Sequence, residues 1–243
     1  MRPLLFACIL LGSVAGGSAA LTQNDGVLNR RCYGTGDPRQ TIEACTKVIA
    51  DGIVDRDDLG GAFKLRGAAY ADIGAYDKAI EDYDHAIAIN PGDADVLNER
   101  GASYGAKGEY GLSILDYDRA IAIKPESPMA LSNRCFAKAV VDQLEEAVAD
   151  CNESLRLRPD NSNTFASRGF AYLKLGRPKE AIADYDAEIK KNPGNAYSLF
   201  GRGISKQLTG DLPGGRADMA EAMKIKAGIA EAMAKLGVRV DPR

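Results

Sequence analysis

Small and aromatic residues recur along this chain with a period of 34 residues, counted here in blocks that begin at Gly60. Position 8 is glycine in four of the five blocks, and positions 20 and 27 are each alanine in three. Positions 11 and 24 are each tyrosine in three blocks, as at Tyr70 and Tyr83. Small residues let two antiparallel helices approach closely, while the aromatic rings fill the space to the next block. The pattern therefore predicts one helical hairpin per block, which is stable only when its neighbours stack on it.

Glycine and proline mark the ends of the predicted helices. Position 15 is glycine in four blocks, where a left-handed backbone can end the first helix: Gly74, Gly108, Gly176 and Gly210. Position 32 is proline in four blocks and limits the second helix: Pro91, Pro125, Pro159 and Pro193. These signals divide the chain into five units: 60–93, 94–127, 128–161, 162–195 and 196–229.

This combination of period and residue types resembles the tetratricopeptide repeat, a two-helix unit of 34 residues. The resemblance covers 60–229 and implies an all-α solenoid, a right-handed superhelix of antiparallel helix pairs in one domain. Before it, segment 38–51 carries Ile42, Cys45 and Val48 on one face and predicts a single capping helix within a segment 21–59. After it, residues 230–243 are expected to form the end of a closing helix and a tail.

The first twenty residues have the features of a secretory signal peptide. Arg2 precedes an apolar run from Leu4 to Leu11, and the segment ends in the small residues Ser18-Ala19-Ala20. A membrane anchor needs about 20 apolar residues, so this run is too short for one. Cys8 has the surroundings of a lipoprotein signal but stands too early in the segment. We therefore expect residues 1–20 to be cleaved near Ala20, giving a periplasmic or secreted protein without a membrane span.

Four cysteines remain after Cys8 is removed, an even number that indicates disulfides in an exported protein. In a hairpin that turns near position 15, position 8 faces position 24. The third block alone places cysteine at both positions, as Cys135 and Cys151. We expect these two to be bonded, the alternative being two buried thiols. By elimination, Cys32 pairs with Cys45.

A periodic pattern of charged residues accompanies the pattern of small residues. Position 7 is arginine and position 23 is aspartate in every block. These positions also face each other across the hairpin, so each arginine is expected to form an ion pair within its own unit. The alternative is a row of arginines that binds anions. Five arginines at position 7 depart from the apolar residue of many family members but resemble a recurrent bacterial variant.

Catalytic and metal-binding patterns are not found in the sequence. His85 is the one histidine, and the expected place for it is a solvated helix surface. Histidine-based triads and multi-histidine metal sites therefore lack their parts. The formal net charge is −3, and it falls to −4 when Arg2 is removed, so a basic field for nucleic acid is absent. We predict a protein that is not an enzyme and has no cofactor.

The resemblance implies that the first helix of each unit lines a concave groove with its positions 2, 5, 6, 9, 12 and 13. In the first two units these positions hold several alanines and the polar residues Lys64, Asp72, Asp95, Asn98 and Glu99. In the last three they include apolar residues that we expect to contact a partner, whose polar end would lie towards Asn98 and Lys64: Phe136, Val140, Phe170, Leu173, Tyr197, Phe200 and Ile204. The alternative is that the closing helix covers part of this face. The lysine and asparagine clamp of some family members is not reproduced, because Ala68 stands where the asparagine belongs.

The sequence thus predicts an exported scaffold or adaptor that binds a protein or peptide in its groove, in a bacterial cell envelope. A regulatory subunit of an envelope enzyme is the alternative, and an enzyme in its own right is the least favoured. The partner, the pathway, the oligomeric state and the choice between a helical and an extended ligand do not follow from the sequence.

Overall fold

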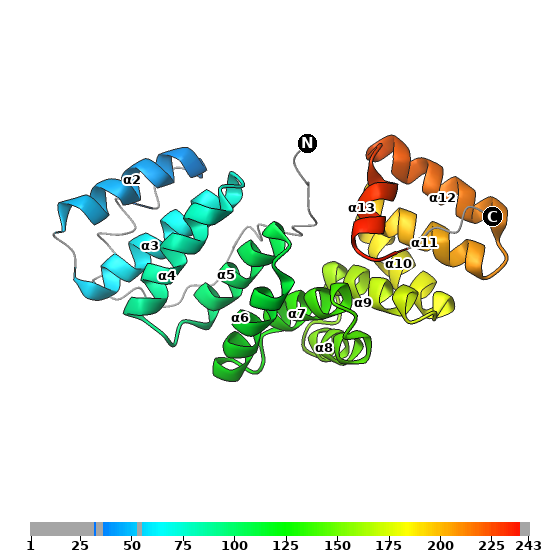
Figure 1. The fold of residues 1–243 in the computed structure, drawn as a ribbon, viewed down its shortest axis with the longest axis horizontal. Coiled ribbons are helices and arrows are strands. Elements are labelled where there is room, and N and C mark those ends of the chain that lie inside the picture. Colours follow the sequence, from blue (N-terminus) through cyan, green and yellow to red (C-terminus); the bar gives the residue numbers. More distant parts are fainter. Residues whose placement is uncertain (1–31, 33–35, 53–54, 239–243) are drawn as a thin grey trace. The chain divides into compact units, whose positions relative to one another are not determined.

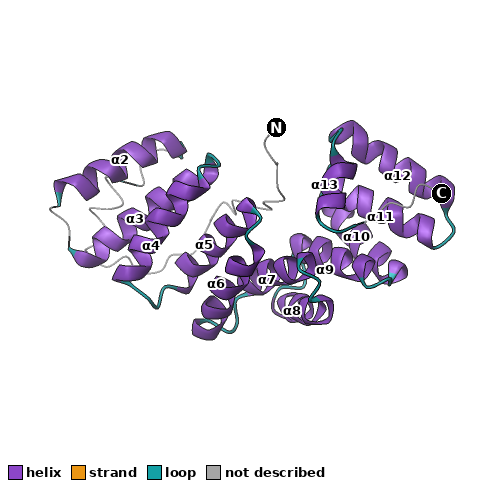
Figure 2. Cartoon of the chain, viewed as in Figure 1, coloured by secondary structure: helices purple, strands orange, loops and turns teal. Residues whose placement is uncertain are grey.

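A computed structural model describes Cys32 and residues 36–52 and 55–238. These residues form twelve helices and no strand, so the fold is all-α as predicted (Figure 2). The predicted signal peptide, 1–20, lies outside the described residues. Within the described part, no helix is long and apolar enough to cross a membrane. The described residues group into two compact units, the first ending at Pro125 and the second beginning at Glu126.

The first unit contains five helices (Figure 1). They are α2 (Pro38–Asp51), α3 (Arg56–Asp72), α4 (Tyr76–Ile89), α5 (Ala94–Lys107) and α6 (Tyr110–Ile123). Each helix packs against the one before it. Helix α2 is the predicted capping helix, and its buried Cys45 and Val48 form a small core with Ala62 of α3 and with Cys32.

The second unit contains the remaining seven helices (Figure 1). They are α7 (Pro128–Val140), α8 (Leu144–Leu157), α9 (Ser162–Lys174), α10 (Pro178–Lys191), α11 (Ala196–Leu208), α12 (Leu212–Ile225) and α13 (Ile229–Lys235). Consecutive helices again pack together, and the first helices of successive hairpins, α7, α9 and α11, also contact each other. Each predicted block thus holds one helix pair, and α13 follows the last pair.

The second helix of each hairpin ends two residues before the predicted proline. Asn90 precedes Pro91 and has φ −127° and ψ 90°, an extended conformation. A residue before proline is driven out of the helical region by a clash with the ring, so the helix stops one residue earlier still. The fifth block has Ala227 at this position, and Lys226 is nevertheless extended, with φ −143° and ψ 98°. Proline is therefore sufficient for this ending but not necessary.

The first helix of each hairpin is followed by a left-handed residue at position 15. Gly74, Gly108, Gly176 and Gly210 all have positive φ, as predicted. The third block has Asp142 there, the one described non-glycine residue with positive φ, at 64°. Aspartate tolerates this region better than most residues. Its carboxylate also forms an ion pair with Lys174 of α9 at 2.8 Å, and the same ammonium donates to the carbonyl oxygens of Ala139 and Val140 at the end of α7.

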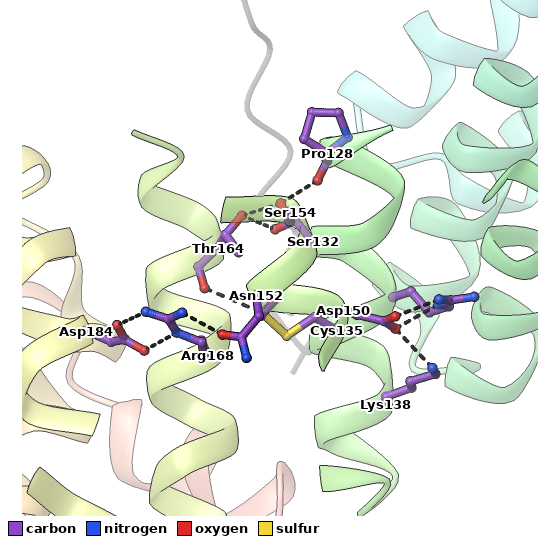
Figure 3. Close-up of a disulfide and its surroundings, with 12 residues drawn as sticks. Pro128, Ser132, Cys135, Lys138, Asp150, Asn152, Ser154, Thr164, Arg168 and Asp184 are labelled. Carbon is purple, nitrogen blue, oxygen red and sulfur yellow. Dashed lines mark hydrogen bonds and ion pairs between the residues drawn. A yellow bond between two sulfur atoms is a disulfide. The ribbon is translucent and has the colours of Figure 1, made fainter. Parts of the chain in front are cut away.

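The slot between the two helices of a hairpin explains positions 8 and 24. A Cβ atom added to Gly101 would lie 2.7 Å from the Tyr117 ring, closer than real contacts allow. In the third block the same slot holds the Cys135–Cys151 disulfide (Figure 3). A short covalent bridge and a glycine–tyrosine contact thus occupy equivalent places, and both hold the helices close.

The second predicted disulfide is not present in the structure. Cys32 and Cys45 are free thiols, although both are fully buried. They lie within hydrogen-bonding reach, and this contact raises the pKa of Cys45 and lowers that of Cys32. The structure therefore brings the two predicted partners into contact as thiols.

Every arginine at position 7 forms the predicted ion pair inside its own hairpin. In the fourth block, Nε and Nη2 of Arg168 donate to the two carboxylate oxygens of Asp184, each at 2.7 Å (Figure 3). The other four pairs repeat this two-point geometry, at distances between 2.6 and 2.8 Å: Arg66–Asp82, Arg100–Asp116, Arg134–Asp150 and Arg202–Asp218. The arginines are thus engaged within the fold, and the alternative of a row that binds anions is not favoured.

A further contact of the same arginines was not predicted. In four of them, Arg66, Arg100, Arg168 and Arg202, the Nη1 nitrogen donates to a residue of the preceding helix. Arg168 reaches Asn152 of α8 at 2.7 Å (Figure 3). Arg202 reaches Asp186 of α10 at 2.7 Å. In the first unit, Arg100 reaches Asp84 of α4 at 2.5 Å. One guanidinium therefore joins the two helices of its hairpin and also attaches the hairpin to the previous one.

Removal of one of these arginines should destabilise the second unit. The Asp184 side chain is only 7% exposed, so Arg168→Ala leaves a buried carboxylate without its two donors. Allowing for the 20% exposure of Arg168, we expect a loss of about 2–3 kcal/mol in unfolding free energy by urea denaturation.

The matched control is Arg156→Ala, which breaks an exposed ion pair with Glu153 on α8. Exposed pairs contribute little, so this change should cost less than about 1 kcal/mol. Equal losses for the two variants would contradict the role given to Arg168.

Candidate functional site

The apolar inner positions of the second unit belong to its core. Phe170 is 5% exposed, Leu173 7%, Phe200 1% and Ile204 6%. The prediction that these four side chains lie open to a partner is therefore wrong for this structure. A residue at an inner position of a first helix is exposed only when nothing else packs over it, and the sequence period does not report that.

The closing segment provides the cover. Helix α13 contacts α11 and α12, and it buries Ile229 and Met233. The residues after it, Leu236 and Val238, are also buried. A Cβ atom at Gly237 would lie 3.2 Å from Nζ of Lys174, so the chain passes over the end of α9 as well. The alternative in which the closing helix covers part of this face is thus the correct one.

The other three predicted contacts of the second unit are half-buried. The rings of Phe136 and Phe170 lie 5.7 Å apart at their centres, and Phe136 therefore extends the apolar cluster rather than standing alone. Val140 ends α7 close to the Lys174 ammonium. The Tyr197 hydroxyl is hydrogen-bonded to Lys226, whose ammonium lies 4.3 Å from the centre of the ring. These residues retain some exposure, but each has partners within the unit.

The inner face of the first unit has a different character. Its two predicted contacts are polar, and Asn98 is nearly buried at 8% exposure. The Lys64 ammonium lies 3.2 Å from the carboxylate of Asp93, the residue that caps the N-terminus of α5. Lys64 is therefore ion-paired within its own chain and is not free to bind an acidic ligand. The structure agrees with the lack of a lysine and asparagine clamp.

Acidic side chains dominate this face. Asp72 at the end of α3 and Asp95 at the start of α5 are exposed, while Glu99 projects from the middle of α5 and is only partly exposed. No ion pair within 4.0 Å is found for Asp72 or Glu99 among the described residues. The neighbouring inner positions 9 are Ala68 and Ala102, so the surface between the carboxylates has no large side chain.

Glu99 is the chemically unusual residue of this surface. Its Oε2 atom is shut off from solvent and has no hydrogen-bond partner among the described residues. Burial raises the pKa of Glu99 to about 7, although Lys64 and the hydroxyl of Tyr83 oppose the shift. Burial also raises the pKa of Asp72. Burial therefore outweighs the attraction of Lys64 at Glu99.

We define the acidic face as Asp72, Asp95, Asn98, Glu99 and Lys64. The sequence identified these residues as inner-facing because of their repeat positions. It did not distinguish Glu99 from its neighbours, because burial and an unpartnered oxygen depend on how Tyr83 of α4 packs under α5. The available signal was that position 6 is acidic only in this block.

Among the described residues, no group of three or more His, Cys, Asp or Glu side chains is arranged to hold a metal ion. The arrangement of the acidic face offers charge and hydrogen-bond acceptors, which suit the binding of a cationic or hydrogen-bond-donating group.

Comparison with known proteins identifies the repeats. A family model described as TPR repeat matches residues 67–108, and one described as Tetratricopeptide repeat matches residues 168–228. No curated protein matches this sequence.

Solved structures support the same fold. PilW, described as a type IV pilus biogenesis factor, has a TM-score of 0.70 and 18% identity and covers 90% of this chain and 100% of its own. A tetratricopeptide repeat protein from Parabacteroides merdae has a TM-score of 0.68 and 17% identity over 88% of each chain. YrrB, described as a TPR protein with an unusual peptide-binding site, has a TM-score of 0.58 and 16% identity, over 81% of this chain and 100% of its own. At these identities the likeness establishes the fold alone.

Truncation of Phe200 should test its assignment to the core. Phe200→Ala removes a ring that is 1% exposed and should cost about 3–5 kcal/mol of unfolding free energy. The control on the same helix is Leu208→Ala, because Leu208 is 62% exposed and should cost less than about 0.5 kcal/mol. Thermal unfolding followed by circular dichroism compares them. A Phe200→Ala protein as stable as the control would show that this ring is not core.

The raised pKa of Glu99 makes a prediction about stability and pH. A carboxyl whose pKa is higher in the folded protein stabilises it fully below the unfolded value of about 4.5, and this contribution is lost as pH rises through 7. Glu99→Gln mimics the neutral form. The variant should therefore exceed the native protein in stability at pH 8 by up to about 3 kcal/mol and match it near pH 4. Urea unfolding at both pH values measures the difference, and a difference that is independent of pH would contradict the shift.

Proposed function

Because the chain belongs to the tetratricopeptide repeat family, we propose that it is a scaffold that binds another protein, and that the acidic face of its first unit is the binding surface. The family provides the general expectation of protein–protein interaction. The observation that favours this particular surface is the contrast between the two units. Phe170 and Leu173 of α9 and Phe200 and Ile204 of α11 are buried, and α13 packs against α11, whereas Asp72 and Asp95 on α3 and α5 are exposed.

The physical properties of the acidic face fit this role. Position 9 is alanine on both α3 and α5, so only a small side chain projects there from each helix. A peptide segment could therefore approach the helices closely. Carboxylates at the rim attract a partner of opposite charge and restrict its orientation. The name of the similar structure YrrB includes a peptide-binding site, which is a property of that protein and a precedent for this fold.

We further propose that the protein acts outside the cytoplasm, as an adaptor in a bacterial cell envelope. The support is the sequence of residues 1–20 and the disulfide between Cys135 and Cys151, since such bonds persist in oxidising compartments. The proposal includes no catalytic role and no cofactor.

Charge reversal on the acidic face should abolish partner capture. The Asp95 side chain is 64% exposed, so Asp95→Lys changes the charge of the surface without disturbing a core contact. The protein is crosslinked in its native compartment and recovered, and bound proteins are identified by mass spectrometry. We expect the native chain to recover one main partner, and Asp95→Lys to reduce its yield at least about tenfold.

Glu81→Lys is the matched control, because Glu81 is an exposed residue on the second helix α4 of the same unit. It should leave the yield unchanged. Equal recovery by Asp95→Lys and native protein would rule out this surface, and an intact mass that still includes Met1 would rule out export.

A further inference from the structure

We propose that Cys32 and Cys45 form a reversible disulfide, which stabilises the capping helix α2 at the start of the repeat array. The sequence predicts only that these two cysteines pair, and the structure holds them as thiols. One buried site therefore has two redox states, which differ in how firmly α2 is held. This switch is independent of the acidic face and of the partner proposed to bind there.

The two thiols lie in one small apolar core. They share it with Val48 of α2 and Ala62 of α3, and all four residues are at most 2% exposed. The thiols are within hydrogen-bonding reach, so a small side-chain movement brings the sulfur atoms to the disulfide bond length of about 2 Å. A disulfide has no hydrogen-bond donor that burial would leave unsatisfied. The core thus suits either state.

A guanidinium next to this core favours reaction at Cys32. Nη1 of Arg66 on α3 donates to Oγ1 of Thr46 at 3.1 Å, and Thr46 follows Cys45 in the sequence. The hydrogen bond with Cys45 lowers the pKa of Cys32 against the effect of burial, and the charge of Arg66 lowers it further. The thiolate is the form that attacks a disulfide. Cys32 is therefore the nucleophile, and Cys45 is the thiol that completes the bond.

Oxidation proceeds by exchange with a disulfide compound, R–S–S–R. The Cys32 thiolate attacks one sulfur of this compound, forms a mixed disulfide and releases one RS⁻. The Cys45 thiol then loses its proton and attacks the Cys32 sulfur, and the second RS⁻ leaves. In total the two cysteines lose two electrons and two protons, and R–S–S–R is reduced to two RSH.

The position of α2 at the end of the array makes this pair easier to reach than the other. Among the described helices, α2 packs against α3 alone, so the loss of one interface opens the core. The Cys135–Cys151 bond lies in a hairpin whose two helices, α7 and α8, both pack against α9. We therefore expect mild reduction to break the Cys32–Cys45 bond and to leave the Cys135–Cys151 bond intact.

Peptide mapping of the full chain tests the bond. The protein is incubated with oxidised or reduced glutathione, remaining thiols are blocked with N-ethylmaleimide, and trypsin digestion is followed by mass spectrometry without reduction. Trypsin places Cys32 and Cys45 in separate peptides, 32–39 and 40–47. We expect these peptides to be joined after oxidation and separately blocked after reduction.

The second cysteine pair is the internal control, because trypsin also separates its members, into peptides 135–138 and 139–156. These should stay joined under both conditions. Free Cys32 and Cys45 after oxidation would overturn the inference, and so would a bond from either of them to another cysteine. Loss of the Cys135–Cys151 bond before the Cys32–Cys45 bond would contradict the order of reduction.

Hydrogen exchange tests whether the bond stabilises α2. Closing the loop from Cys32 to Cys45 restricts the unfolded segment, so amide exchange in α2 should be at least about tenfold slower in the oxidised protein than in the reduced one. Cys45→Ser and Cys32→Ser should each abolish this difference, which is measured within each variant. Glu43→Ser, at an exposed position of the same helix, should retain it. Equal exchange in the two states of the native chain would overturn the switch.

Discussion

One ion pair, repeated in every hairpin, is the interaction on which the rest of the structure depends. An arginine at position 7 of the first helix makes two hydrogen bonds to the aspartate at position 23 of the second. In the described contacts of Arg100, Arg168 and Arg202, the same guanidinium also reaches the preceding hairpin. One planar group therefore fixes the distance between two helices and the placement of the next pair. Because the aspartate is nearly buried, neither partner can be removed alone without cost.

The period made most of the fold predictable. Glycine at position 8 and tyrosine at position 24 fill one slot, so the appearance of Cys135 and Cys151 at those positions was enough to predict their bond. The second contact of the arginines was missed although the period carried a signal for it. The acceptors Asp84, Asn152 and Asp186 all stand at position 25 of their blocks. Cys32 comes from a segment without a repeat, and its position beside Cys45 was inferred only by elimination.

The candidate site was predictable in location and not in exposure. Repeat positions pointed to residues of each first helix, but Phe200 is buried on α11, which α13 contacts, and Phe170 is buried on α9 with its ring against Phe136. The polar residues of the first unit include Glu99 and Asp72, whose pKa values are raised by burial. Burial over Tyr83 raises the pKa of Glu99, and Lys64 opposes the shift. The proposed binding surface therefore combines exposed carboxylates with one that is partly buried.

Site-specific photo-crosslinking tests the central claim, that a partner binds on the inner face of α5, most directly. A benzophenone amino acid is placed at Ala102, an inner position of α5, or at Glu81, an exposed position of the second helix α4. Both proteins are irradiated in the native compartment. We expect a single crosslinked partner from position 102 and none from position 81. Crosslinking from position 81 without any from position 102 would contradict the account.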